Sequence, residues 1–162
     1  MGDVTPFAGM ARFYDRIYAF KDYHAEADKV AGFIRQFRRS GGRRLLDVAC
    51  GTGLHLEHLC DEFDCEGLDI SEEMLAEARK RLPEIVFTRG DMLDFDLGRR
   101  FDAVTNLFSS VGYMTTPEML ERAVANMARH LEPGGVLLVE PWITPEAWLG
   151  GMVSAETVDE PG

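Results

Sequence analysis

Two acidic residues and a glycine turn are the residues of this sequence best placed to do chemistry. Asp47 belongs to the apolar run 45–48, which leads into Gly51 and Gly53, and Asp69 ends the next apolar run. Glycines after a strand let the backbone approach a ligand closely. Because open α/β sheets bind ligands at the carboxyl ends of their strands, this spacing predicts a site for a nucleoside cofactor.

The same residues favour S-adenosylmethionine over a dinucleotide. A dinucleotide site has the pattern Gly-x-Gly-x-x-Gly, and the third glycine is missing here, where Leu56 stands. An acid at Asp47 suits a cationic amino group and repels a pyrophosphate. Asp69 can accept hydrogen bonds from both ribose hydroxyls, because an ionised carboxylate is an acceptor through two oxygens. An NAD-dependent dehydrogenase is therefore a distant alternative.

The composition is that of one ordinary globular domain with an acidic balance. The chain has 162 residues, 46% hydrophobic and 28% charged, and a formal net charge of −11. That charge argues against nucleic acid as a partner and disfavours an anionic membrane surface. A local basic pocket for a nucleotide diphosphate stays open, with Arg12, Arg16 and Lys21 as candidates. Solvated surface charges are the alternative for these three residues.

Cysteine and histidine indicate neither a disulfide framework nor a metal site. Cys50, Cys60 and Cys65 are odd in number and form no Cys-x-x-Cys pair, so we expect reduced thiols. His55 and His58 lie three apart, but without a third ligand nearby a surface or capping role is favoured over metal binding. No N-terminal apolar run approaches a signal peptide or a membrane span, and the cytoplasm is the expected location.

The elements that position these residues alternate between strand and helix. Apolar spacing predicts helices over residues 10–20 and 23–37 before the first strand. Ser71 followed by two glutamates indicates a helix N-cap, and residues 131–135 are expected to close the last helix and turn into the fifth strand. We expect strands at about 44–49, 65–70, 85–88, 101–107 and 135–140, and helices at about 54–62, 72–82 and 117–131. This alternation is typical of a parallel sheet with crossover helices.

Four motifs in order resemble the class I S-adenosylmethionine-dependent methyltransferases. They are Asp47-Val-Ala-Cys-Gly-Thr-Gly53, Gly67-Leu-Asp69, Gly90-Asp-Met92 and Leu131-Glu-Pro-Gly-Gly-Val136. Within this superfamily the chain resembles bacterial nucleotide-sugar N,N-dimethyltransferases of macrolide amino-sugar biosynthesis. The segments that match these enzymes are Tyr14-Asp15, Lys21-Asp-Tyr23, Arg79-Lys-Arg-Leu-Pro83, Phe108-Ser-Ser-Val-Gly-Tyr113 and Val139-Glu-Pro-Trp142.

The resemblance implies an α/β, Rossmann-like class I methyltransferase fold with a mostly parallel central sheet flanked by helices. Residues 1–40 are expected to form an N-terminal helical lid, 41–146 the S-adenosylmethionine-binding core, and 147–162 a truncated or flexible tail of the same single domain. The family's sheet has seven strands and ends in an antiparallel hairpin, but the residues after Pro141 contain no convincing strand pair. We therefore expect the C-terminal strands to be missing and the chain to be a fragment.

The expected cofactor site follows the strand ends. Asp69 should hold the ribose, and Ile70 should pack on the adenine. The resemblance implies that Asp91 hydrogen-bonds the adenine amino group and that Met92 forms a wall under the ring. Further cofactor contacts are expected from Asp47, Ala49, Gly51 and Gly53 around the methionine part, from Tyr23 in the lid, and from Leu107 near the reactive methyl group.

The expected acceptor site is aromatic. The resemblance implies that Tyr14 is the catalytic residue and reaches the acceptor amine from the first helix. Phe108 and Trp142 are expected to form the substrate wall. Packing of an apolar helix face on the sheet is the alternative for Tyr14. Ile143 stands where the sugar dimethyltransferases usually have a second aromatic residue, so the acceptor pocket differs from theirs.

These residues predict an enzyme that methylates a small molecule with S-adenosylmethionine and without a metal. N-methylation of an amino group, such as that of a dTDP-amino sugar, is favoured because a hydroxyl acceptor usually needs a base or a metal. An O- or C-methyltransferase acting on another small molecule is one alternative. A truncated fragment that binds the cofactor without turnover is the other.

Overall fold

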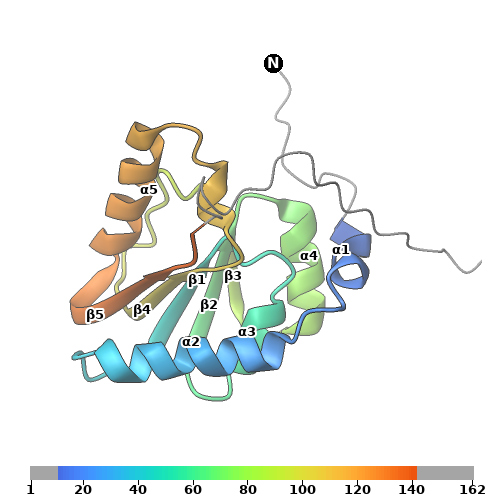
Figure 1. The fold of residues 1–162 in the computed structure, drawn as a ribbon, viewed down its shortest axis with the longest axis horizontal. Helices are drawn as coiled ribbons and strands as arrows, with labels where there is room; N and C mark the ends of the chain where they lie inside the picture. Colours follow the sequence, from blue (N-terminus) through green and yellow to red (C-terminus); the bar gives the residue numbers. More distant parts are fainter. Residues whose placement is uncertain (1–10, 142–162) are drawn as a thin grey trace, which may run out of the picture.

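Apolar runs of the sequence form five parallel strands, with helices on both faces of the sheet (Figure 1). The computed structural model describes residues 11–141. The strands are β1 (Arg44–Val48), β2 (Asp64–Asp69), β3 (Val86–Arg89), β4 (Phe101–Asn106) and β5 (Leu131–Val139). Their order is β3-β2-β1-β4-β5, with every pairing parallel, which confirms the predicted α/β class.

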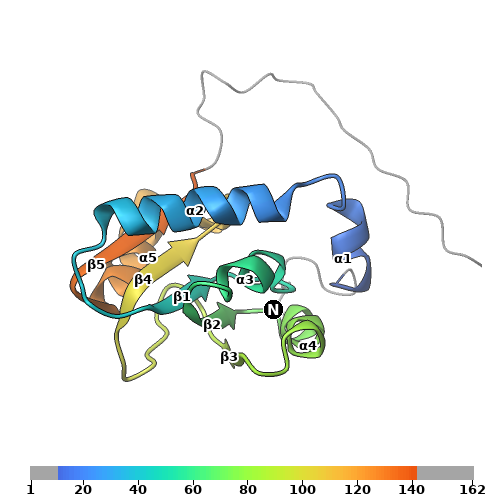
Figure 2. The same cartoon turned by 90° about the horizontal axis from the view of Figure 1, so that it is seen from below.

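Most of the helices lie on the two faces of this sheet, and α1 lies beside α4. They are α1 (Ala11–Ile17), α2 (Tyr23–Phe37), α3 (Leu54–Leu59), α4 (Glu72–Arg81), a 3-10 helix (Ser110–Tyr113) and α5 (Pro117–Arg129). Figure 1 shows α2 and α5 on opposite sides of the sheet, and Figure 2 shows α3 between α2 and the strands. None of the helices within residues 11–141 is both long enough and apolar enough to cross a membrane.

Alternate residues of the central strand fill two separate cores. Leu45 packs with Ile34 of α2 and Leu56 of α3, whereas Leu46 packs with Phe101 and Met127 under α5. Side chains of a strand alternate between its faces, so a central strand covered on both sides must be apolar throughout. Asp47 interrupts this run while staying buried, so its carboxylate needs a polar partner.

The strand order brings the functional loops to one edge of the sheet. The chain runs from β1 outward to β3 and then returns to the other side of β1 as β4. Strand order reverses between β1 and β4, and a crevice opens at such a switch point beyond the carboxyl ends of the strands. The loops that follow β1, β2, β3 and β4 therefore meet there.

The predicted cap of α4 is confirmed, whereas the predicted end of the last helix and the turn predicted after it are wrong. Ser71 caps α4 through the N–H of Met74, as predicted. The last helix already ends at Arg129, and β5 begins at Leu131, which pairs with Phe101, so the segment expected to be a turn belongs to the strand. A register shift follows within this segment, where the Gly134 carbonyl accepts the N–H groups of Arg39 and Ser40. The expected tail of residues 147–162, the absent hairpin and Trp142 lie outside the described residues.

Replacing Gly67 with alanine is expected to lower the free energy of unfolding by about 1–3 kcal/mol, the usual cost of overpacking a core. An added Cβ would lie 2.5 Å from a ring carbon of Phe87 and 2.8 Å from the Cys50 sulfur. Urea denaturation measures the change. Gly41→Ala is the matched control, because no described atom lies within 4 Å of its added Cβ. Equal stabilities of the two variants would contradict the packing of β2 against β3.

Candidate active site

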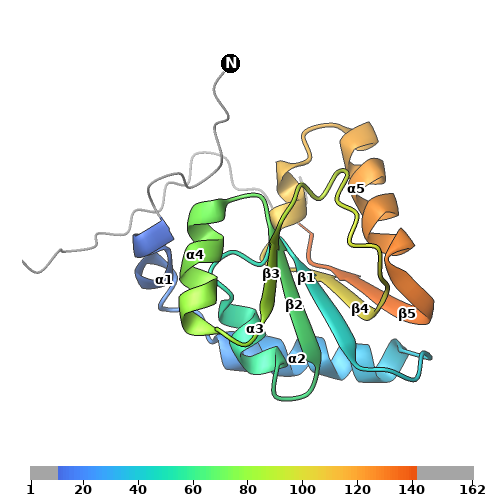
Figure 3. The same ribbon diagram turned by 180° about the vertical axis from the view of Figure 1, so that it is seen from behind.

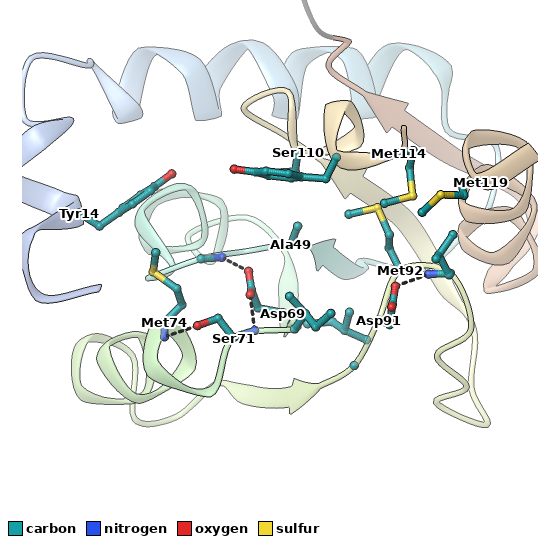
Figure 4. Close-up of a pocket in the computed structure, with 16 residues that line it drawn as sticks. Tyr14, Ala49, Asp69, Ser71, Met74, Asp91, Met92, Ser110, Met114 and Met119 are labelled. Atoms are coloured by element: carbon teal, nitrogen blue, oxygen red, sulfur yellow. Dashed lines mark hydrogen bonds between the residues drawn. The ribbon is translucent and has the colours of Figure 1, made fainter. Parts of the chain in front are cut away.

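The carboxyl ends of the strands open into a cavity of about 230 Å³, here called the main cavity. Figure 4 shows Tyr14 pointing into it from α1 and Met92, Met114 and Met119 gathered at the opposite end. The sequence-predicted residues that line it are Tyr14, Ala49, Gly51, Asp69, Ile70, Asp91 and Met92.

A smaller side compartment adjoins the main cavity, with which it shares Tyr14, Ala49 and Gly51. The other predicted residues that line it are Tyr23, Asp47, Leu107 and Phe108. The structure thus gathers the predicted residues within 11–141 around two joined compartments, with Gly53 as the exception. An added Cβ on Gly53 would lie 3.5 Å from Ala78, so this residue faces the α4 packing surface instead.

Asp69 organises the loops around the main cavity. Its two carboxylate oxygens accept the N–H groups of Gly51 and Ser71, both at 2.8 Å (Figure 4). Burial raises the pKa of Asp69 above its usual range, while these backbone donors favour the charged form. Each carboxylate oxygen keeps capacity for a second hydrogen bond, so Asp69 can also accept from a diol.

Asp47 is buried without a cation among the described residues. It is 2% exposed, and the Thr105 hydroxyl donates to its Oδ1 at 2.7 Å. Burial raises the pKa of Asp47 to about 7, with a smaller contribution from the charge of nearby Asp69 and against the lowering effect of the hydrogen bond from Thr105. Because burial of an unpaired carboxylate is unfavourable, the side compartment favours a ligand that brings a positive charge.

The backbone of the first loop is left-handed at three positions. Ala49, Gly51 and Gly53 have φ values of 61°, 57° and 81°. Glycine adopts this conformation at little cost, whereas alanine does so under strain. The strained residue lines both compartments, and strained residues of this kind cluster at ligand sites.

Tyr14 forms the roof of the site. Its ring packs 4.7 Å from that of Tyr18, which in turn meets the Phe108 ring edge-on at 4.9 Å. Burial, followed by the effect of Tyr23, raises the pKa of Tyr14 above its usual range. The residue therefore stays a neutral phenol, which can orient a polar group but does not act as a phenolate base.

The far end of the main cavity is apolar and lined by flexible methionine side chains. Asp91 accepts the N–H of Leu93 through Oδ1 at 2.9 Å, which turns the chain after β3 into the cavity wall. Ile70 is 42% exposed, so its apolar side chain is available to a flat ligand. Methionine side chains adapt to irregular shapes and contact aromatic rings favourably. This end fits a planar heteroaromatic base.

The pair of His55 and Glu26 borders the site and was not revealed by the sequence, and Lys21, a candidate for a basic pocket, pairs with Glu26. His55 is buried rather than on the surface, with Nε2 2.8 Å from Glu26 Oε2, and it lines the side compartment. Lys21 Nζ lies 2.8 Å from Glu26 and 3.9 Å from the centroid of the Phe108 ring. Glu26 is a charged residue of α2, and no local signal in the sequence indicates that its side chain meets His55 of α3.

Phe108 is held in a strained conformation by the end of β5. Phe108 and Ser109 have φ values of 53° and 57°, in the left-handed region. The Phe108 N–H donates to Glu140 Oε2 at 2.7 Å, and the Ser109 hydroxyl donates to the Pro141 carbonyl at 3.0 Å. These bonds turn the Phe108 side chain into the side compartment. Within the described part of the chain, no group of three His, Cys, Asp or Glu side chains is arranged to hold a metal ion.

Comparison with known proteins identifies the family. The sequence profile of a family described as a methyltransferase domain matches residues 45–135. A dTDP-3-amino-3,4,6-trideoxy-alpha-D-glucopyranose N,N-dimethyltransferase from Streptomyces venezuelae is 54% identical over 155 residues, which are 94% of this chain and 65% of that protein. The chain thus spans just under two thirds of the length of this relative.

Solved structures agree with the sequence comparison. The crystal structure of DesVI from Streptomyces venezuelae matches with a TM-score of 0.85 at 54% identity, covering 90% of this chain and 63% of that one. S-adenosylmethionine-bound CalS10, an amino pentose methyltransferase from Micromonospora echinaspora, matches with a TM-score of 0.82 at 45% identity, covering 100% of this chain and 68% of that one. The chain therefore belongs to the methyltransferase domain family, as its resemblance to the class I S-adenosylmethionine-dependent methyltransferases predicted.

Proposed function

We propose that this chain carries the cofactor site and part of the acceptor site of an enzyme that methylates the amino group of a nucleotide-linked amino sugar with S-adenosylmethionine. The observation that supports this most directly is the pair of buried carboxylates, Asp47 and Asp69, at the ends of two neighbouring strands. Among the described residues Asp47 has no cationic partner, and Asp69 can accept hydrogen bonds from a diol. The activity named for the Streptomyces venezuelae relative supplies the acceptor class.

The described residues fit S-adenosylmethionine. The ammonium of its methionine part would pair with Asp47, and its ribose hydroxyls with Asp69. The Tyr23 hydroxyl is buried and has no hydrogen-bond partner among residues 11–141, and it borders the compartment proposed for the methionine part. A buried hydroxyl without a partner is unfavourable, so a ligand carboxylate there would complete the site.

Methyl transfer requires the protein mainly to align the amine with the methyl group and to exclude water. When bound, S-adenosylmethionine supplies a methyl group on a positively charged sulfur. A neutral amine would attack the methyl carbon in line with the carbon–sulfur bond, with S-adenosylhomocysteine as the leaving group. Tyr14 would orient the amine as a phenol, and Phe108 and Leu107 would keep water from the reacting atoms. The free thiols Cys50, Cys60 and Cys65 fit the reducing cytoplasm proposed as the location.

Calorimetric titration is expected to show binding of S-adenosylhomocysteine and none of NAD. Asp69→Asn should weaken that binding about 100-fold, because two hydrogen bonds to a charged acceptor contribute about 1.5 kcal/mol each. An amide also cannot accept from both Gly51 and Ser71. Asp28→Asn, at a 74% exposed side chain on α2, is the control with unchanged affinity. Tighter binding of NAD than of S-adenosylhomocysteine would overturn the proposed cofactor.

Binding of S-adenosylhomocysteine is expected to weaken as pH falls from 8 to 6. The pKa of Asp47 is raised to about 7, so the group is increasingly protonated below that value. Pairing with the ligand's ammonium requires the carboxylate, and the dissociation constant should therefore rise by up to about tenfold per pH unit below 7. Asp47→Asn should bind more weakly at pH 8 and lose the slope. A flat profile in the unmodified chain would show that Asp47 meets no cation.

Tyr14→Phe is expected to lower turnover about tenfold while leaving the affinity for S-adenosylhomocysteine unchanged. The lost hydroxyl removes one orienting hydrogen bond, which contributes about 1.5 kcal/mol. Mass spectrometry of mono- and dimethylated dTDP-3-amino-3,4,6-trideoxyglucose measures the rate. Tyr18→Phe keeps the ring contacts with Tyr14 and Phe108 and serves as the control. Equal rates for both variants would remove Tyr14 from the catalytic role.

A further inference from the structure

The helix that carries Tyr14 is held over the site by polar contacts as well as by aromatic packing. α1 has seven residues, too few to be stable as an isolated helix in water. All three ribbon views place it beside α4, at the end of the molecule where α2 begins (Figures 1, 2 and 3). Contacts with α4 and with the loop below must therefore fix its position.

Asp15, next to Tyr14, makes the central contact. The Thr52 hydroxyl donates to its Oδ1 at 2.5 Å, and the Arg81 guanidinium donates to its Oδ2. Arg81 also donates to the Thr52 carbonyl at 2.5 Å, so the three residues close a ring of hydrogen bonds. Thr52 is 1% exposed and the Arg81 side chain 21%. Partial burial makes such a charged pair stronger than one on the open surface.

The ring joins the helix to the cofactor loop. Thr52 lies between the left-handed Gly51 and Gly53, and the Gly51 N–H donates to Asp69. Both the hydroxyl and the carbonyl of Thr52 are used, so a movement of this turn breaks two of the three contacts. Arg81 is fixed independently at the end of α4, where its Nε lies 3.5 Å from Glu57 of α3.

We propose that Asp15, Arg81 and Thr52 form a latch that ties closure of α1 to the conformation of the glycine turn. Asp15 and Arg81 are then positioning residues for Tyr14. The inference rests on the proposed function in that the main cavity is taken as the cofactor site. Because Tyr14 lines both compartments, we expect α1 to move when bound cofactor leaves. The latch thus slows cofactor exchange and holds the phenol in place for the acceptor.

The rate of S-adenosylhomocysteine dissociation, followed by stopped-flow displacement, tests the latch. Asp15→Asn and Arg81→Gln should each raise this rate about tenfold, and the double variant should be no faster than either single one, because all three break the same pair. Arg81→Lys keeps the charge but loses the planar guanidinium, so its dissociation rate should lie between those of the unmodified chain and Arg81→Gln. Lys80→Gln is the control, since Lys80 is 70% exposed and pairs with Glu77 instead. Equal dissociation rates in all variants would overturn the latch.

Hydrogen exchange of the α1 amides gives a readout that needs neither turnover nor ligand. In the ligand-free chain, exchange of α1 should be faster in Asp15→Asn than in the unmodified chain, with the amides of β1 unaffected. S-adenosylhomocysteine should slow α1 exchange in the unmodified chain and much less in Asp15→Asn. Identical α1 exchange in the two ligand-free proteins would overturn the latch. Failure of the unmodified chain to bind S-adenosylhomocysteine would contradict the proposed function, and the ligand-free comparison would still decide on the latch.

Discussion

The hydrogen bonds of the buried Asp69 carboxylate are the interaction on which the rest of the site depends. They hold the N–H of Gly51 in the turn after β1 and the N–H of Ser71 at the start of α4. A single charged group thus sets the relative positions of two loops from neighbouring strands. Ser71 in turn caps α4, whose last residue, Arg81, reaches the glycine turn from the other side. The loop is therefore fixed from both ends of one helix.

Sheet order explains why a carboxylate can be buried at the centre of the molecule. β1 lies between β2 and β4, and Asp47 is paired in register with Gly67 on one side and Thr105 on the other. The Thr105 hydroxyl provides the hydrogen bond to Asp47 on one side, while Phe87 and Cys50 fill the space beside Gly67 on the other. These neighbours keep Asp47 in place without a cation of their own. This is why we propose that the carboxylate meets a cationic group of the ligand at the strand end.

Local patterns predicted most of the fold, whereas contacts between distant residues could not be predicted. The bounds of α2 and the cap at Ser71 follow from spacing and from a hydrogen bond across three residues, which sequence alone can indicate. The positions of Asp47 and Asp69 follow from the rule that ligands bind at strand ends. By contrast, Asp15 and Arg81 are 66 residues apart, and His55 and Glu26 are 29 apart. Such pairs depend on how α1, α2 and α4 pack, and the early start of β5 depends on its pairing with β4.

The backbone conformation of the first and fourth loops also sets a limit on how far this protein can be stabilised. Ala49, Phe108 and Ser109 are non-glycine residues in the left-handed region, and the first two line the site. Each costs on the order of 1 kcal/mol that the surrounding fold must offset. Selection for heat resistance would therefore find glycine at these positions early. The same substitutions would make the loops more flexible and remove the side chains of Ala49 and Phe108 from the site. A gain in stability at these positions would therefore weaken the positioning of the ligand.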